Sequence, residues 1–301
     1  MTAPDGCGTA LVTPFRTGGA LDIAAFERLA EWQLEEGIDF LLACGSTGEA
    51  QTLGADERAK VVHAAVRVAR GRAPIVAGAT DNDTSRAVDE ARRMCDAGAD
   101  FILSACPPYN KPSQEGLRRH FEAIADASPR PIILYNIPGR TAVNLLPATT
   151  ARLAQHPNII GLKDSSGDMH QSLEMLSLRP KGFTVLAGDD WIALPLILAG
   201  AEGLVSVASN VAPALMTRLV HLARAGQLDE ARRLGKTLLS LMDVHFIESN
   251  PAPVKAGLAL QGRIENVLRL PLLPVQEASL SRIRAEYEKA GILHAEASAH
   301  A

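Results

Sequence analysis

One lysine of this chain follows directly on an apolar stretch and is itself followed by polar, turn-forming residues. Residues 159–162 lead into Lys163, and Asp164-Ser165-Ser166-Gly167 come next. A short apolar stretch bounded by turn residues predicts a buried strand, so Lys163 stands where that strand leaves the core. Loss of water there favours the neutral amine, which can attack a carbonyl carbon and form a Schiff base. The alternative is an ordinary strand-end lysine that extends its charge into solvent.

Polar side chains follow other predicted strands as well. The turn Gly45–Glu49 carries the hydroxyls of Ser46 and Thr47, and a turn of this kind can hold a carboxylate with its backbone N–H groups. Two of the three tyrosines, Tyr109 and Tyr135, also stand at strand ends. A phenol can pass protons when it is paired with hydroxyls and a nearby ammonium. A single tyrosine that only packs, with its hydroxyl hydrogen-bonded, is the alternative.

The remaining strand ends carry one arginine and a pair of acids. Arg140 offers a planar fork suited to a carboxylate, unless it forms only a surface ion pair. Asp189 and Asp190 could ligate a metal, but no further ligands accompany them, so capping of the next helix is the favoured interpretation. Of the seven lysines only Lys163 ends a predicted strand. Without a nucleophile–histidine–acid set, a phosphate loop or a metal cluster, the set favours Schiff-base chemistry on a 2-oxo acid.

Eight apolar stretches, alternating with helical patterns, must position these residues. They are residues 8–13, 38–43, 74–78, 101–105, 131–135, 159–163, 183–187 and 203–207. Alternation of strand and helix predicts parallel strands, and eight such units favour closure into a (β/α)8 barrel, an α/β fold without sheet edges. The alternative, a doubly wound open sheet, usually has a glycine-rich turn after its first strand, which is absent here. In a barrel the polar residues named above collect at one face.

The pattern changes after the eighth strand. Helical patterns cover residues 213–224, 228–247, 252–260 and 275–290, and only the first is needed to complete eight units. We therefore expect a barrel over residues 1–225 and a C-terminal helical region over residues 226–301. The expected role of that region is packing against the barrel or against a second subunit.

Composition narrows the class of protein. The chain has 301 residues, 47% of them hydrophobic, and a net charge of -4 without blocks of like charge, so neither nucleic acid nor a membrane surface is expected as a partner. Four widely spaced cysteines (Cys7, Cys44, Cys95 and Cys106) predict neither disulfides nor a zinc site. A signal-peptide pattern and an apolar run long enough to span a membrane are both lacking, so a cytoplasmic location is expected.

Four segments of the chain resemble one known group of enzymes. They are Gly45–Glu49, Pro107–Pro112, Tyr135–Thr141 and Gly161–Asp164, and their order and spacing match as well. On these motifs the chain resembles the dihydrodipicolinate synthase / N-acetylneuraminate lyase superfamily of class I aldolases, over about residues 8–293. Within that superfamily, Arg140 and Tyr109 are similar to the dihydrodipicolinate synthase branch, since the lyases lack this arginine.

The resemblance implies a role for each matching residue. Lys163 forms the imine with pyruvate, so no cofactor and no metal are implied. Tyr135 is the proton donor and acceptor, and Thr47 and Tyr109 complete the relay, with Tyr109 reaching into a neighbouring subunit. Thr47 and Ser46 hold the pyruvate carboxylate.

Three more residues are implied to bind substrate. Arg140 would bind the carboxylate of aspartate semialdehyde at the entrance, while Val205 and Gly188 would line the pyruvate pocket. The implied reaction is condensation of these two substrates in lysine (diaminopimelate) biosynthesis, by a homotetramer built from tight dimers. A serine at position 46, where the synthases commonly have threonine, keeps the hydroxyl.

The residues that bind inhibitory lysine in regulated members are largely replaced. Ala55 and Arg58 stand where histidines occur, Arg86 where a glutamate occurs and Pro108 where a tyrosine occurs; only Asn82 matches. The resemblance therefore implies that free lysine does not inhibit.

Two other functions stay open at this point. One is a different pyruvate-dependent aldolase acting on a sugar acid or hydroxy acid, which would not need Arg140. The other is a non-catalytic sugar-acid-binding barrel, against which the joint presence of Lys163, Tyr135 and Thr47 argues.

Overall fold

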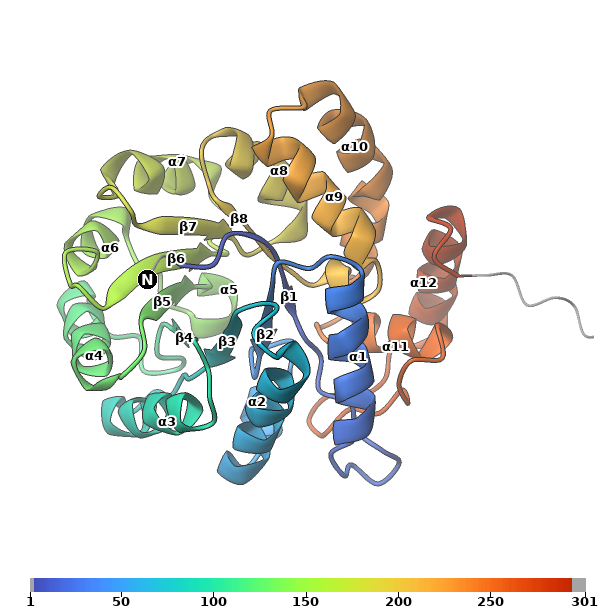
Figure 1. The fold of residues 1–301 in the computed structure, drawn as a ribbon, viewed down its shortest axis with the longest axis horizontal. Coiled ribbons are helices and arrows are strands. Elements are labelled where there is room, and N and C mark those ends of the chain that lie inside the picture. Colours follow the sequence, from blue (N-terminus) through green and yellow to red (C-terminus); the bar gives the residue numbers. More distant parts are fainter. Residues whose placement is uncertain (1–2, 294–301) are drawn as a thin grey trace, which may run out of the picture.

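The computed structural model describes residues 3–293 and contains a closed barrel of eight parallel strands (Figure 1). The strands pair in sequence order, and the eighth pairs with the first. They are β1 (Gly6–Ala10), β2 (Phe40–Ala43), β3 (Ile75–Gly78), β4 (Phe101–Ala105), β5 (Ile132–Asn136), β6 (Ile159–Asp164), β7 (Thr184–Ala187) and β8 (Gly203–Ser206). The predicted (β/α)8 barrel is confirmed.

Only the first strand departs clearly from its predicted bounds. It was expected over residues 8–13, but it begins at Gly6 and ends at Ala10. The strand ends where a side chain from the turn after the neighbouring β8 takes over its backbone bonds. The Val12 N–H donates to Oδ1 of Asn210 at 3.1 Å, and the Asn210 Nδ2 donates to the Ala10 carbonyl at 2.8 Å. The apolar residues after Ala10 therefore lead away from the sheet.

Helices surround the barrel and continue beyond it (Figure 1). Those between strands are α1 (Ile23–Glu35), α2 (Ala55–Ala69), α3 (Thr84–Asp96), α4 (Gln114–Ala127), α5 (Pro138–Thr141), α6 (Pro147–Leu153), α7 (Met169–Leu178) and α8 (Asp190–Leu198). Those after β8 are α9 (Pro213–Arg224), α10 (Leu228–Val244), α11 (Ala252–Leu260) and α12 (Glu277–Lys289). Residues 294–301 of the expected C-terminal region lie outside the described residues. The short α5 was not predicted.

Apolar side chains fill both sides of the strands. Inside the barrel, one buried cluster includes Phe40, Phe101, Ile133, Tyr135 and Val205. A larger cluster lies between the strands and the surrounding helices. Strands buried on both faces read as continuous apolar runs, which is why the sequence shows them so clearly.

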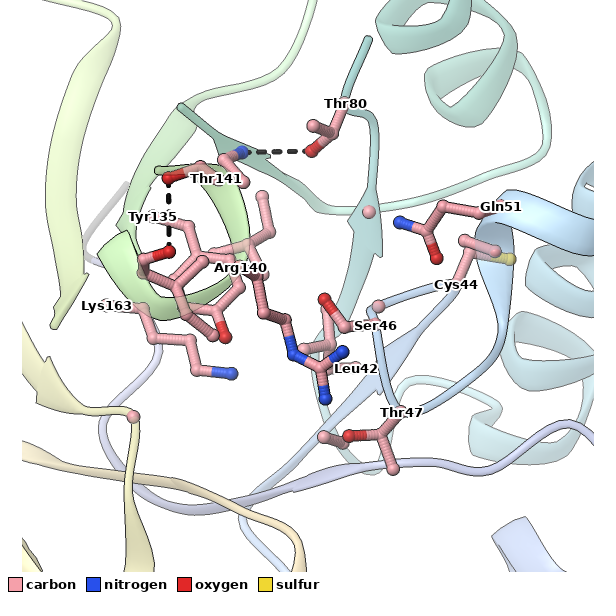
Figure 2. Close-up of a pocket in the computed structure, with 18 of the residues that line it drawn as sticks. Leu42, Cys44, Ser46, Thr47, Gln51, Thr80, Tyr135, Arg140, Thr141 and Lys163 are labelled. Carbon is pink, nitrogen blue, oxygen red and sulfur yellow. Dashed lines mark hydrogen bonds between the residues drawn. The ribbon is translucent and has the colours of Figure 1, made fainter. Parts of the chain in front are cut away.

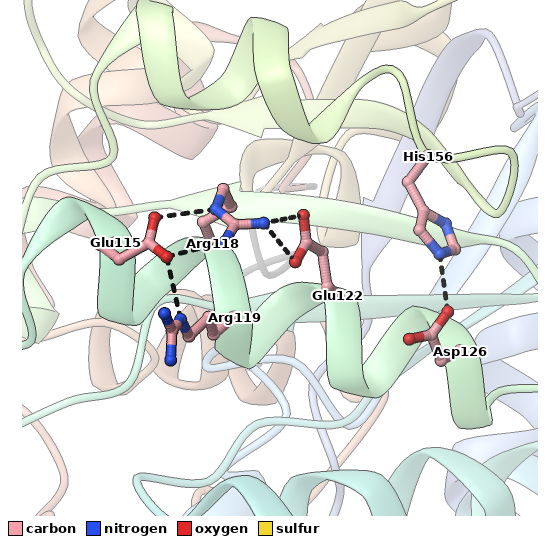
Figure 3. A network of polar contacts seen from close by, with 6 residues as sticks. All are labelled: Glu115, Arg118, Arg119, Glu122, Asp126 and His156. Carbon is pink, nitrogen blue, oxygen red and sulfur yellow. Dashed lines mark hydrogen bonds and ion pairs between the residues drawn. The ribbon is translucent and has the colours of Figure 1, made fainter.

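On the outer side of the barrel, charged side chains connect helices to each other and along their length (Figure 3). On α4, Arg118 bridges Glu115 at 2.7 Å and Glu122 at 2.5 Å. The histidine after α6, His156, contacts Asp126 at the end of α4 at 3.0 Å. Pairs spaced three and four residues apart support an exposed helix by a few tenths of a kcal/mol each.

A buried ion pair joins the C-terminal helices to the barrel. The Lys255 Nζ, at the start of α11, donates to Glu49 Oε1 at 2.5 Å and to the Thr13 carbonyl at 2.9 Å, and both charged side chains are fully buried. The other Glu49 oxygen accepts from the Arg269 backbone N–H at 3.1 Å. Burial lowers the pKa of Lys255, and the neighbouring carboxylate of Glu49 opposes that shift. The loop after β2 is thus fixed by the C-terminal region.

Within residues 3–293 no helix combines the length and apolarity needed to cross a membrane. The same residues contain no grouping of three or more histidine, cysteine, aspartate or glutamate side chains that could hold a metal ion.

Candidate active site

A cavity of about 530 Å³ opens at the carboxyl end of the barrel strands (Figure 2). Loops after most of the strands contribute to its wall, and so does the segment that follows α10. Its polar lining includes Ser46, Thr47, Thr80, Tyr135, Arg140, Lys163, Asp189 and Asn250. The structure therefore brings together most of the residues that the sequence predicts for the site, at the face expected of a barrel.

Lys163 and Tyr135 are neighbours across two adjacent strands. The register of β5 and β6 places the two residues directly opposite each other. Both are buried, and the Lys163 Nζ lies 4.2 Å from the centre of the tyrosine ring. Both polar ends point toward the middle of the pocket (Figure 2). An amine and a phenol held this way can act on the same bound carbonyl compound.

Gly188, after β7, forms the wall beside the lysine. A Cβ at this position would lie 2.0 Å from the Ser165 hydroxyl oxygen and 3.0 Å from Cε of Lys163. The lysine side chain therefore passes close to a glycine backbone, and the Cβ of any larger residue would collide with the Ser165 hydroxyl and crowd the lysine. The structure places Gly188 in the cavity lining, and its role in holding pyruvate stays a prediction.

The hydroxyl-bearing turn after β2 also lines the cavity, with Ser46 and Thr47 both present. The Gly48 N–H donates to the Gly45 carbonyl at 3.1 Å, and the Thr13 hydroxyl donates to the Gly48 carbonyl at 2.7 Å. These bonds fix the turn from both sides, so the two hydroxyls are presented by a rigid loop.

Arg140 lies on α5 and extends across the pocket toward that turn (Figure 2). Its guanidinium donates to the backbone carbonyl of Asn250 at 3.0 Å. The side chain is exposed at the rim of the cavity, where a charged substrate would enter. Its planar donors suit a carboxylate in that position.

The two acids after β7 do not act as the predicted helix cap. Asp189 occupies the N-cap position of α8, yet its side chain makes no capping bond. The Asp190 carboxylate instead accepts from the Ser206 hydroxyl at 2.5 Å and from two backbone N–H groups, those of Val207 and Ala208. Buried Asp190 therefore fixes the end of β8. Two adjacent acids in a sequence do not indicate such a contact.

Asp189 lines the cavity near the lysine. Burial raises the pKa of Asp189 to about 6, and the Lys163 ammonium opposes the shift. A carboxyl group that titrates near neutral pH is a common feature of active sites.

Two predicted residues lie outside the cavity lining. Tyr109 is 88% exposed on the loop after β4 and does not line the chain's own pocket, although the adjacent Pro108 does. Val205 belongs to the buried cluster inside the barrel, and the cavity is lined instead by Val207, two residues further on. The roles expected for Tyr109 and Val205 stay predictions.

Two lining residues from the C-terminal region were missed, Phe246 and Asn250. The Asn250 side chain donates from Nδ2 to the Thr47 hydroxyl oxygen at 3.0 Å. The asparagine precedes two prolines in Asn250-Pro251-Ala252-Pro253, a segment that breaks the helical pattern, and this interruption was the available signal.

A buried lysine at the end of a barrel strand, beside a tyrosine and facing a hydroxyl-lined turn, defines the class of Schiff-base-forming barrel aldolases. The profile of the "Dihydrodipicolinate synthetase family" matches residues 3–290. The chain belongs to this family, and the predicted resemblance is confirmed.

Individual relatives agree over nearly the whole chain. A 4-hydroxy-tetrahydrodipicolinate synthase of Koribacter versatilis is 50% identical over 289 residues, covering 96% of each chain. A dihydrodipicolinate synthase from Acinetobacter baumannii, solved with pyruvate, is 40% identical with a TM-score of 0.95, over 97% of this chain and 100% of that one. The dihydrodipicolinate synthase of Thermotoga maritima is 40% identical with a TM-score of 0.94, over 96% and 99%.

Substitution of Gly188 tests the close approach of the lysine side chain. In Gly188→Ala the new methyl group must displace Ser165 or Lys163, and misplacement of a reacting group by about 1 Å can cost about 100-fold in rate. We expect a fall in kcat of that order in a protein that still folds, with a melting temperature lowered by the crowding. Gly139→Ala is the matched control, because a Cβ there meets nothing within 4 Å. Equal activity of the two variants would show that the lysine tolerates a side chain beside it.

Proposed function

We propose that this chain condenses pyruvate with L-aspartate 4-semialdehyde to form 4-hydroxy-tetrahydrodipicolinate. The proposal is supported by membership of the family and by the activity for which full-length relatives are named. The observation that carries it is the buried Lys163 amine, 4.2 Å from the Tyr135 ring, in a cavity rimmed by Arg140.

In the proposed mechanism the Lys163 amine attacks the keto carbon of pyruvate, and the carbinolamine loses water to give an imine. The protonated imine withdraws electrons, so the methyl group loses a proton and an enamine forms. The enamine carbon attacks the aldehyde, whose oxygen takes up a proton. The substrate's own amine then attacks the imine carbon, closes the ring and releases Lys163. Because the lysine itself is the electron sink, no added cofactor is needed.

Other residues bind and move protons in this proposal. Tyr135 gives and takes the protons, with Thr47 and Tyr109 completing the relay. The turn with Ser46 holds the pyruvate carboxylate by its N–H groups and hydroxyls. Arg140 at the rim pairs with the carboxylate of aspartate semialdehyde.

Gly188 and Val205 have simpler proposed roles in the same site. The Gly188 backbone leaves room for the lysine and its bound pyruvate. Val205, packed beneath the cavity, closes the pyruvate pocket from the barrel interior.

Borohydride reduction in the presence of pyruvate tests the covalent step. The peptide containing Lys163 should gain the mass of a reduced pyruvate adduct, and Lys163→Ala should lose both the adduct and nearly all synthase activity while remaining folded. Lys181→Ala, an exposed lysine in a loop, is the matched control and should behave as the unmodified chain.

The aldehyde is tested separately by rate assays. Aspartate semialdehyde should be turned over far faster than N-acetylneuraminate or 2-keto-3-deoxygluconate is cleaved. Adduct formation with a preference for a sugar acid would favour a different aldolase, and the absence of any adduct would favour a binding protein.

We further propose that the chain works as a homotetramer built from dimers, in which Tyr109 enters the site of the neighbouring subunit. Support comes from its position, since this tyrosine is 88% exposed and outside its own cavity lining. Pro107, Pro108 and Pro112 restrict the loop that presents it. An exposed aromatic side chain on a stiff loop is suited to insertion into a partner.

Mixing two inactive variants tests this sharing. Tyr109→Phe lacks the relay phenol and Lys163→Ala lacks the amine, so neither should be active alone. Co-expressed, they should regain activity, because a mixed dimer has one site with both groups. Failure to regain activity in demonstrated mixed dimers would mean that the tyrosine serves its own chain.

Free lysine should not inhibit. Arg58 forms an ion pair with Glu90 at 2.8 Å, and Arg86 forms one with Asp81 at 3.0 Å. These two positions therefore carry positive charges, which repel the ammonium groups of a free lysine. Initial rates should stay constant as lysine is raised to millimolar concentrations, with ionic strength held fixed. A saturable, lysine-specific fall in rate would contradict this expectation.

A further inference from the structure

Asn250 contacts two functional residues that lie far apart in the sequence. Its Nδ2 donates to the Thr47 hydroxyl oxygen at 3.0 Å, and its backbone carbonyl accepts from the Arg140 guanidinium, also at 3.0 Å. The residue is 6% exposed, lines the cavity and belongs to the segment between α10 and α11. One residue of the C-terminal region thus connects the hydroxyl turn after β2 with the arginine at the rim.

The contact with Thr47 also has a direction. An amide nitrogen can only donate, so the Thr47 oxygen is the acceptor and its single proton remains free for another partner. Among the described residues, Asn250 is the only hydrogen-bond partner of this hydroxyl. The proton of Thr47 is therefore available inside the cavity rather than bound to the loop.

A second feature is that, within residues 3–293, the side-chain amide of Asn250 bonds through its nitrogen alone. The Asn250 Oδ1 is buried without a partner among the described residues. Leaving a buried acceptor unpaired costs about 1–3 kcal/mol. Here only the donor side of the amide is used, and it is used on Thr47.

We propose that Asn250 is a positioning residue for the reaction: its side-chain amide orients the Thr47 hydroxyl as a proton donor, and its backbone carbonyl holds Arg140 at the rim. The inference rests on the proposed relay role of Thr47. It assigns to the C-terminal region a part in proton transfer, in addition to packing.

Asn250→Asp is the sharpest test, because it keeps the shape but replaces the donor by an acceptor. Thr47 must then donate its proton to the carboxylate, which removes it from the relay. Since acid–base groups contribute about 100-fold or more, we expect kcat to fall about 10- to 100-fold. The KM for aspartate semialdehyde should change little, because the carbonyl that holds Arg140 is unaltered. Borohydride trapping of pyruvate on Lys163 should persist and show that the site is intact.

The matched control is Gln261→Glu. This amide likewise donates through its nitrogen, to the Val211 and Ile292 carbonyls, and has a buried, unpaired oxygen, but it is not part of the cavity lining. It should keep its activity. An equal loss in both variants would show that exchanging an amide for a carboxylate disturbs the fold, and would overturn the proposal.

A double-mutant cycle with Thr47→Val tests separately whether Asn250 acts through Thr47 and whether Thr47 takes part in the proton relay. If Asn250 acts through Thr47, adding Asn250→Asp to the Thr47→Val variant should cause little further loss of kcat. A full additional loss in that background would overturn the positioning role while leaving Thr47 in the relay. A Thr47→Val variant with unchanged kcat would instead refute the relay on which the inference rests.

Discussion

The register between β5 and β6 is the constraint on which the rest of the site depends. It sets Tyr135 directly opposite Lys163, and β7 then sets Leu186 on the other side of the lysine. Because side chains alternate along a strand, a shift by one residue would move the amine or the phenol to the opposite face of the barrel wall. Closure of the sheet by the pairing of β8 with β1 leaves no free edge at which such a shift could be accommodated. Lys163 and Tyr135 are therefore positioned by hydrogen-bonded strands of the closed barrel and not by loops.

The loops above the strands need a different support, and the C-terminal region supplies it. The ion pair between Lys255 and Glu49 is fully buried, and removal of two charges from water is repaid only when both are present and hydrogen-bonded. Because Lys255 and Glu49 must stay paired, α11 is held against the turn that carries Ser46 and Thr47. Asn250, five residues before Lys255, makes its contacts from the same anchored segment. A region whose expected role was packing thus forms one wall of the cavity.

The sequence was sufficient to predict the barrel because the strands are buried on both faces and appear as short, mostly apolar runs. Lys163 could be singled out because it is the only lysine at the end of such a run. Asn250 could not be singled out, because its partners Thr47 and Arg140 lie 203 and 110 positions away in the sequence. A periodic pattern of apolar residues does not indicate contacts over such separations. Asp189 and Asp190 look alike in sequence, and only the fold separates a cavity-lining acid from one bound to β8. The expectation for Val205 came from the resemblance alone. Tyr109 was marked by its place after a predicted strand, and only its role in a neighbouring subunit came from the resemblance.

The long sequence separation between the hydroxyl turn and its anchors has a consequence for the chain during its synthesis. All eight strands have left the ribosome once Ser206 has emerged, and a domain can fold as a unit while synthesis continues. The turn after β2 must nevertheless wait for Asn250 and Lys255, more than two hundred positions later, before Glu49 finds its counter-charge. A nascent chain can thus contain all eight strands while the turn that carries Ser46 and Thr47 still lacks its C-terminal contacts. The active site can be completed only during the last quarter of translation.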